Sequence, residues 1–255
     1  MYSINVKDIK FVYEKPAAII HANGKDRLVI GDLHIGVEKR LIDKGVKLYN
    51  ATEIMAKEVA SIASEFDINE IIMLGDIKDS IMHPERSELM GIKGFFNALE
   101  GYNVKIVRGN HDAYISEITG IEPVDELLVG RFALLHGNRW PTESAMRKSY
   151  LMTAHNHISV SFRDKRGGYY QYKAWMIAKL NPEEAAKRYE CFNRNAKLVM
   201  MPAFNELIMG MPISRHDNDN INPLVRNKIF DYANGTVYNL AGENLGTLSK
   251  ISESV

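Results

Sequence analysis

The chain of 255 residues contains one cysteine, Cys191, and therefore cannot form an internal disulfide bond. Because small secreted proteins commonly depend on disulfides, this scarcity predicts a reducing compartment, and we expect a cytoplasmic protein. No apolar run approaches the ~18–20 residues that a membrane helix requires. The first residues are mixed and charged, unlike a secretory signal. These absences predict a soluble protein without a membrane partner.

The chain also lacks a net charge, because 32 Lys and Arg residues balance 32 Asp and Glu residues. Dedicated nucleic-acid binders usually carry a basic excess, so the overall composition does not favour that class, although a local basic face is compatible with it. Glycine (18 residues) and proline (8) are too few for a collagenous or low-complexity chain. A hydrophobic fraction of 45% is typical of a folded chain, and we expect one domain over residues 1–255.

Short apolar runs alternate with amphipathic segments over the first two thirds of the chain. Apolar residues at spacings of three and four predict helices over residues 52–66 and 85–99. Strands that alternate with helices predict an α/β fold in which at least part of the sheet is parallel. The predicted strands are residues 27–30, 71–74, 104–107, 132–135 and 150–153.

Each of these five runs is followed by Asp, Asn or His. In parallel α/β sheets, ligands collect outside the carboxyl ends of the strands, so these side chains are expected to converge. A single histidine at a strand end is usually structural, but several beside carboxylates are not explained by core packing. The residues are Asp32, His34, Asp76, Asn110, His111, His136, His155 and His157.

Imidazole and carboxylate groups together favour Zn, Mn, Fe, Ni or Co over calcium, and one cysteine excludes a thiolate site. Seven candidate ligands, without His111, exceed one coordination sphere and would form two sets of four if one carboxylate bridges. Two ions about 3.5–4 Å apart are the arrangement that catalyses phosphoryl transfer. His155 and His157 would face the same side if they lay on a strand. His111 adjoins Asn110 and is placed to protonate a leaving oxygen.

Five short blocks resemble, in order, those of the calcineurin-like metallophosphoesterases. They are Asp-Leu-His at 32–34, Gly-Asp-Ile-Lys-Asp at 75–79, Gly-Asn-His-Asp at 109–112, His-Gly at 136–137 and Ala-His-Asn-His at 154–157. Residues 32–38 and 201–207 further resemble the ICC-like phosphoesterase branch, which includes archaeal members and the bacterial ligase-associated phosphoesterase. With these stretches the resemblance covers nearly the whole chain.

The resemblance implies a four-layer αββα sandwich of two mixed β-sheets flanked by helices. It also implies two divalent metal ions, with manganese expected first and iron, nickel or zinc as alternatives. Asp32, His34 and His157 would hold one ion. Asn110, His136 and His155 would hold the other, and Asp76 would bridge the two.

The implied reaction is hydrolysis of a phosphoester by in-line attack of a hydroxide that bridges the two ions. His111 would act as general acid, oriented by the carboxylate of Asp112 or Asp79. Two positions depart from the family pattern. Ala154 replaces a glycine, which should be tolerated unless the backbone needs a positive φ. Asp79 stands where nuclease-type members often have histidine, so the substrate class stays open.

After His157 the alternation of strands and helices gives way to two adjacent predicted strands and a helix, which predicts a hairpin–helix elaboration over residues 158–197. Strands are expected at 159–162 and 169–175, a helix at 182–194 and a further strand at 198–201. Residues 163–197 carry nine basic and four acidic residues, interleaved with Tyr169, Tyr170, Tyr172 and Trp175. Such a pattern is more common in an edge hairpin followed by a solvated basic helix. The functional alternative is a surface that binds nucleic acid or forms a homo-oligomer.

In that functional alternative, Arg163, Lys165 and Arg166 would guide an anionic diester substrate into the metal cleft.

Two other charged residues also allow two interpretations. Lys78 could contact a phosphate but is more typical of a solvated loop, whereas Glu38 could orient a ligand or simply lie on a helix face. The polar stretch 214–223 is predicted to be a loop.

Three functions are compatible with these residues. The leading hypothesis is a metal-dependent phosphodiesterase, with nucleic acid among its substrates. A phosphomonoesterase acting on nucleotides or phosphoproteins would need the same ligands. A scaffold that retains the fold without catalysis is the third, but such proteins typically lose ligands or the acid histidine, and all are present here.

Overall fold

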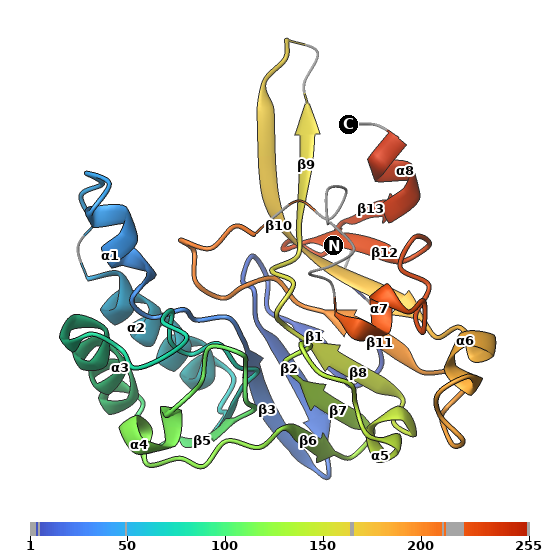
Figure 1. Cartoon of the computed structure of the whole chain (residues 1–255), viewed down its shortest axis with the longest axis horizontal. Coiled ribbons are helices and arrows are strands. Elements are labelled where there is room, and N and C mark those ends of the chain that lie inside the picture. Colours follow the sequence, from blue (N-terminus) through green and yellow to red (C-terminus); the bar gives the residue numbers. More distant parts are fainter. Residues whose placement is uncertain are drawn as a thin grey trace.

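The structure, a computed structural model, describes residues 4, 6–48, 50–163, 166–210, 212 and 222–253, with only the backbone of residues 252 and 253. Two β-sheets pack face to face, and helices cover the outer face of each sheet (Figure 1). The predicted fold class, a four-layer sandwich of two mixed sheets flanked by helices, is confirmed. None of the described helices combines the length and apolar character needed to cross a lipid bilayer.

The first sheet has five strands in the order β1-β2-β3-β4-β5. Its first three strands are antiparallel, whereas β4 and β5 run parallel to β3 because helices connect them. The strands are β1 (Ile9–Phe11), β2 (Ala18–Ala22), β3 (Lys25–Ile30), β4 (Glu70–Met73) and β5 (Asn103–Ile106). The helices on this side are α1 (Val37–Ile42), α2 (Ala51–Glu65), α3 (Arg86–Ala98) and α4 (Ile115–Thr119).

The second sheet has eight strands, seven of them in the order β13-β12-β10-β11-β8-β7-β6, and β9 pairs with the first half of β10. The strands are β6 (Glu126–Val129), β7 (Phe132–Leu135), β8 (Tyr150–Thr153), β9 (Ser159–Arg163), β10 (Tyr169–Lys179), β11 (Lys197–Met200), β12 (Thr236–Asn239) and β13 (Asn244–Thr247). The helices on this side are α5 (Glu143–Met146), α6 (Pro182–Ala186), α7 (Pro223–Arg226) and α8 (Leu248–Glu253).

Three apolar layers separate the four layers of secondary structure. The layer between the sheets contains Val29 of β3 and Met152 of β8, whereas their strand neighbours face the helices. This follows from the alternation of side chains along a strand: Leu28 packs toward α2, and Leu151 packs toward the helices of the second sheet. The strands are apolar on both faces, which explains why they are detectable as continuous apolar runs.

The predicted strands are all present, with boundaries that differ by up to four residues. The predicted helix at 182–194 is too long, because α6 ends at Ala186. The side chain of Asn181 caps its first turn as expected. Beyond the helix, the backbone N–H of Asn193 donates to the carbonyl of Met146, which turns the chain back toward β11. Most of the predicted loop at 214–223 lies outside the described residues.

The hairpin of β9 and β10 extends away from the body of the molecule, but its base is firmly anchored (Figure 1). The Nζ atom of Lys173 donates to the carbonyls of Ala203 and Asn205, each at 2.7 Å. The side chain of Gln171 donates to the carbonyl of Gly210 at 2.8 Å. The second half of β10 joins the large sheet, and Trp175, expected among the interleaved aromatics, is fully buried between the sheets.

Lys173 is expected to make the stability of the fold depend on pH. Burial lowers its pKa from 10.5 to about 8, although nearby carboxylates act in the opposite direction. Between these two values the unfolded chain holds the proton that the folded chain releases, so the free energy of unfolding should rise with pH, by about 3 kcal/mol at most.

Urea unfolding from pH 7.5 to 10 measures this contribution, with the wild type and a Lys173→Met variant compared at each pH. The difference between their free energies of unfolding should change across this range. Parallel pH profiles would contradict the assignment.

Candidate metal centre

The predicted ligands lie where the carboxyl ends of strands from both sheets meet. Asp32 and His34 follow β3, and Asp76 follows β4 of the first sheet. His136 follows β7, and His155 with His157 follows β8 of the second sheet. Asn110 comes from the loop after β5, so the seven predicted ligands reach one place, and His111 follows Asn110 in the same loop.

One group consists of Asp32, His34, Asp76 and His157, whose ligand atoms all lie within 4.8 Å of one another. The Nε2 atoms of His34 and His157 are 3.1 Å apart. Nε2 of His34 is 3.6 Å from Oδ2 of Asp76, and Nε2 of His157 is 3.6 Å from Oδ1 of Asp32. Two carboxylates and two imidazoles thus surround one point.

A second group consists of Asp76, His136 and His155. Nε2 of His136 is 3.4 Å from Oδ2 of Asp76 and 3.1 Å from Nδ1 of His155. The side-chain oxygen of Asn110 lies 3.1 Å from the same Nε2 atom. Asp76 therefore belongs to both groups.

These donors fit two divalent cations. Ligand atoms about 2.0–2.2 Å from a metal ion lie roughly 3.0–3.5 Å from one another, close to the spacings found here. Nδ1 of His136 is 2.7 Å from the carbonyl of Leu74. A carbonyl only accepts, so Nδ1 carries the hydrogen and leaves Nε2 directed at the other donors. The division of the seven residues between two metals stays a prediction that this geometry supports.

The electrostatics of the protein without metal agree with a site built for cations. Burial acts to raise the pKa of the Asp76 carboxyl, but the hydrogen bond and charge of His136 hold it well below its usual range. Burial acts to lower the pKa of His136, but Asp76 outweighs it and raises that pKa to about 9. The pKa of His155 falls to about 4 through burial and the neighbouring charge of His136. A metal ion must therefore displace a proton from His136.

The backbone at these positions is strained. Five of the seven residues adopt the left-handed conformation, which costs of order 1–3 kcal/mol each for residues other than glycine and clusters at functional sites. His155 and His157 do not lie on a strand, which was the condition under which they would face the same side, and their rings enter different groups. The φ angles are 56° for Asp32, 40° for His34, 51° for Asp76, 68° for His155 and 43° for His157.

Two glycines let the motif loops approach one another. A Cβ atom on Gly109 would lie 2.2 Å from Oδ1 of Asp76, and one on Gly75, at a φ of 77°, would lie 2.7 Å from Nδ1 of His136. Ala154, which departs from the family pattern, does not have a positive φ. Its methyl group occupies space left by Gly31, where an added Cβ would be only 2.8 Å away.

Asp112 does not orient His111, contrary to the prediction. Its fully buried carboxylate accepts hydrogen bonds from the backbone N–H groups of Asp76, Ile77 and Gly109, each at 2.8 Å. Burial and the charge of Asp76 raise its pKa. Asp112 thus holds together the loops that carry Asp76 and Asn110.

His111 lies beside the two groups and is held by a backbone carbonyl. Its Nδ1 atom is 2.5 Å from the carbonyl oxygen of Asp79, and its ring centroid is 5.0 Å from that of His34. The backbone N–H of His111 donates to Oδ1 of Asp76 at 2.9 Å. The carboxylate of Asp79 instead accepts a hydrogen bond from Arg40 at 2.7 Å. Asp79 therefore contacts His111 through its main chain, whereas the prediction used its side chain.

Two charged residues have roles that neither interpretation of the sequence described. Lys78 is fully buried, and its ammonium group donates to the carbonyls of Ser80, Ile81 and Met82. Glu38 accepts hydrogen bonds from the backbone N–H of Gly36 and the hydroxyl of Thr52. Both residues shape loops beside the site.

The predicted substrate-binding residues are placed only in part. Arg163 ends β9 and Arg166 lies in the following turn, both exposed, whereas Lys165 lies outside the described residues. A residue that the sequence analysis missed is Glu88, which is 8% exposed in α3. It precedes Ile92 and Phe95 at helical spacing on the buried face, and a carboxylate in such a position is the signal that could have identified it.

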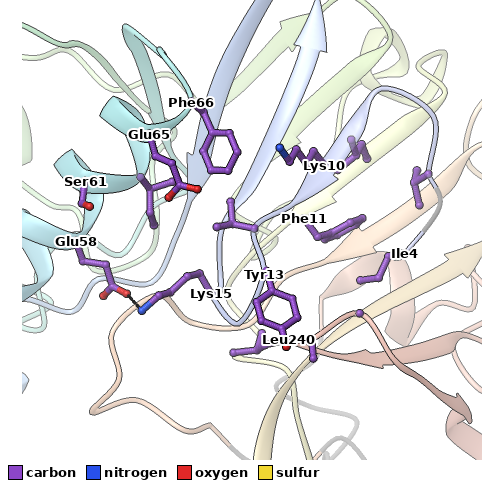
Figure 2. Close-up of a pocket in the computed structure, with 16 residues that line it drawn as sticks. Ile4, Lys10, Phe11, Tyr13, Lys15, Glu58, Ser61, Glu65, Phe66 and Leu240 are labelled. Atoms are coloured by element: carbon purple, nitrogen blue, oxygen red, sulfur yellow. Dashed lines mark ion pairs between the residues drawn. The ribbon is translucent and has the colours of Figure 1, made fainter. Parts of the chain in front are cut away.

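A cavity lies elsewhere, between β1, the second half of α2 and the turn after β12 (Figure 2). Its volume is about 800 Å³, and its walls include Phe11, Tyr13 and Phe66. An ion pair between Lys15 and Glu58 closes one side. None of the seven predicted ligands is among its described lining residues, so it is separate from the candidate metal centre.

Comparisons with known proteins agree with the fold. The crystal structure of the nuclease MPE of Pseudomonas putida aligns with a TM-score of 0.55 and 18% identity, over 90% of this chain and 99% of that chain. The phosphoesterase YfcE of E. coli aligns with a TM-score of 0.33 and 16% identity, over 54% of this chain and 73% of that chain. A predicted phosphoesterase of Streptococcus pneumoniae aligns with a TM-score of 0.31 and 10% identity, over 86% of this chain and 91% of that chain. No curated protein matches.

The fold and the paired Asp and His groups define an α/β protein with a site suited to two metals. The family model of the calcineurin-like phosphoesterases matches residues 27–200, and the chain belongs to that family. The nuclease structure, at 18% identity, supports the fold alone.

A methyl group at Gly109 should remove metal binding without preventing folding. In a Gly109→Ala variant the new Cβ collides with the carboxylate and backbone of Asp76, at 2.2 and 2.3 Å, so the shared ligand must move. Metal content after equilibration with Mn²⁺, measured by plasma mass spectrometry, should fall from two ions per chain to less than one. The thermal stabilisation by Mn²⁺ should also disappear.

The matched control is Gly94→Ala in α3, where an added Cβ meets nothing within 4 Å. This variant should keep both metals and gain about 0.5–1 kcal/mol, because alanine is preferred inside a helix. Full metal content in Gly109→Ala would show that Asp76 is not the shared ligand.

Proposed function

We propose that this protein is a phosphodiesterase that requires two divalent metal ions and acts on nucleic acid. The observation that carries the proposal is the convergence of seven Asp, Asn and His side chains in two groups that share Asp76. Asp32, His34 and His157 would hold one ion. Asn110, His136 and His155 would hold the other, and Asp76 would be shared. Manganese is the first candidate, and iron, nickel and zinc have similar ligand preferences.

The ions, when bound, would supply positive charge to the phosphoryl oxygens and a water of lowered pKa. The chain's own residues then have defined tasks. Asp76 holds the two ligand groups at a fixed separation. Because a carbonyl only accepts hydrogen bonds, Nδ1 of His111 carries a hydrogen, and in the protonated ring Nε2 carries the proton to be donated. His111 is therefore suited to protonate a leaving oxygen.

The hairpin supports nucleic acid as the substrate. Its first strand begins two residues after His157, and the side chains of Tyr169, Tyr170 and Tyr172 on its second strand are 45–52% exposed. Tyr169 lies at the outer end of the hairpin and Tyr172 nearer its base. Arg163 lies opposite Tyr169 in the register of the two strands. Aromatic rings with adjacent cations are the groups that bind bases and phosphates of single strands. The similar structure from Pseudomonas putida is named as a nuclease, which agrees with this choice.

Turnover should depend on metal, on Asp76 and on His111. Metal-stripped protein supplied with Mn²⁺ should hydrolyse bis-p-nitrophenyl phosphate faster than p-nitrophenyl phosphate. Asp76→Asn should reduce this rate to background. On a diester with a poorer leaving group, such as a dinucleotide, His111→Ala should reduce kcat by about 10²–10⁴-fold, the usual contribution of a general acid.

Each other outcome identifies a different function. Faster hydrolysis of the monoester would indicate a phosphomonoesterase acting on nucleotides or phosphoproteins. Bound metal without turnover of either substrate or of oligonucleotides would indicate a scaffold. Undiminished activity in Asp76→Asn would show that the centre described above is not the active site.

Neutralising the hairpin should weaken the salt dependence of nucleic-acid binding. Each phosphate contact contributes about 0.7 to the slope of log K against log salt for a single strand, so loss of three contacts should reduce the slope by about 2. The variant is Arg163→Gln with Lys165→Gln and Arg166→Gln, and binding of a fluorescent single-stranded DNA is measured at several salt concentrations.

A charge-matched control replaces Lys57, Lys93 and Lys187, which lie on or next to helices away from the hairpin, by glutamine. This control should leave the slope unchanged. Equal slopes for the wild type and the hairpin variant would mean that the hairpin does not bind the backbone of the nucleic acid.

A further inference from the structure

A buried carboxylate lies behind the loop that holds His111. Glu88, in the first turn of α3, is 8% exposed. Its Oε1 atom accepts hydrogen bonds from the backbone N–H groups of Asp79 and Ser80, both at 2.9 Å, and from the hydroxyl of Ser80 at 3.0 Å. Glu88 therefore fixes the backbone on both sides of the Asp79 carbonyl.

The planarity of the peptide bond connects Glu88 to His111. The N–H of Ser80 and the carbonyl of Asp79 belong to one planar, trans peptide unit and point in opposite directions. Because Glu88 accepts from that N–H, the carbonyl on the other side of the unit is directed at Nδ1 of His111, 2.5 Å away. One peptide unit thus separates the carboxylate from the imidazole.

The surroundings hold this arrangement in place. Lys78 donates to the carbonyls of Ser80, Ile81 and Met82, so its three N–H groups are satisfied and the turn after Asp79 cannot easily rotate. The stem of Glu88 packs over Gly36, where an added Cβ would lie 2.7 Å from Cγ of Glu88. The carboxylate consequently has little freedom to leave the peptide unit.

We propose that Glu88 is a positioning residue for His111 and acts through the peptide unit between Asp79 and Ser80. The inference rests on the proposed function, in which His111 is the general acid. The acceptor oxygen of Glu88 orients the peptide unit, and its hydrogen bond with the N–H of Ser80 polarises the unit, which strengthens the Asp79 carbonyl as an acceptor. The carbonyl keeps the hydrogen of the neutral ring on Nδ1 and aims Nε2 toward the metal centre. Glu88 thus orients His111 through a peptide unit, whereas the sequence predicted direct contact with the carboxylate of Asp112 or Asp79.

The tautomer of His111 tests this proposal without any turnover. Long-range ¹H–¹⁵N spectra of the imidazole rings are recorded at alkaline pH, where an ordinary imidazole is neutral, in metal-free and Zn²⁺-loaded protein. His111→Ala assigns the signal by its loss. The wild type should show the Nδ1–H form, and Glu88→Ala should shift His111 toward the Nε2–H form.

Two further variants separate positioning from a general loss of structure. Glu88→Gln retains an oxygen that can accept from the N–H of Ser80. This variant should therefore keep the Nδ1–H form, and it can be measured even if Glu88→Ala does not fold. Glu38→Ala removes a nearby carboxylate whose hydrogen bonds, among the described residues, go to the backbone N–H of Gly36 and the hydroxyl of Thr52 and not to the 79–80 peptide unit. It should leave the His111 signal unchanged.

The leaving group supplies a kinetic test. A poor leaving group needs a proton, so Glu88→Ala should reduce kcat on a dinucleotide by about tenfold or more and on bis-p-nitrophenyl phosphate much less. Glu88→Gln should recover most of the loss. In the His111→Ala background, Glu88→Ala should cause no further loss, because both changes remove the same step.

The proposal is overturned if folded Glu88→Ala retains the Nδ1–H form, or if its loss of activity multiplies with that of His111→Ala. A wild-type protein that hydrolyses no phosphoester would overturn the proposed function instead. In that event the tautomer measurement alone still decides whether Glu88 positions His111.

Discussion

The placement of Asp76 is the constraint on which the rest of the site depends. Its carboxylate belongs to both groups of donors, accepts from the backbone N–H of His111 and would be displaced by any side chain at Gly109. Its own backbone N–H is held by Asp112. Because these contacts come from the loops after β3, β5, β7 and β8, a shift of Asp76 would disturb both ligand groups and the proposed acid together.

The support beneath the site consists of buried charges, and each one binds backbone atoms. Asp112 accepts from three N–H groups, Lys78 donates to three carbonyls and Glu88 accepts from two N–H groups. A buried charge is tolerated only when hydrogen bonds replace its hydration, and these residues obtain those bonds from loops that would otherwise be free to move. The same bonds offset the cost of the left-handed conformations at the ligands.

Much of the fold and site was predictable because its signals are local. The predicted strands are continuous apolar runs, and Asp32 or His136 follows such a run within two residues. The predicted helix at 182–194 is too long, because beyond Ala186 the backbone bonds to residues distant in sequence: the N–H of Glu190 donates to Glu143, and that of Asn193 donates to Met146. The solvated position expected for Lys78 was wrong for a related reason, since a lysine is buried only when a particular loop surrounds its ammonium group.

The sequence by itself determined the types and order of the chemical groups: which residues end the strands, that they suit divalent cations and not thiolate chemistry, and that the chain alternates strands and helices. Only the tertiary structure decided how those groups are shared and oriented. It placed His155 and His157 in different groups through strained backbone, and it put a peptide unit between Glu88 and His111. The physical reason is that composition and spacing act along the chain, whereas orientation depends on atoms from loops that meet only after the two sheets have packed.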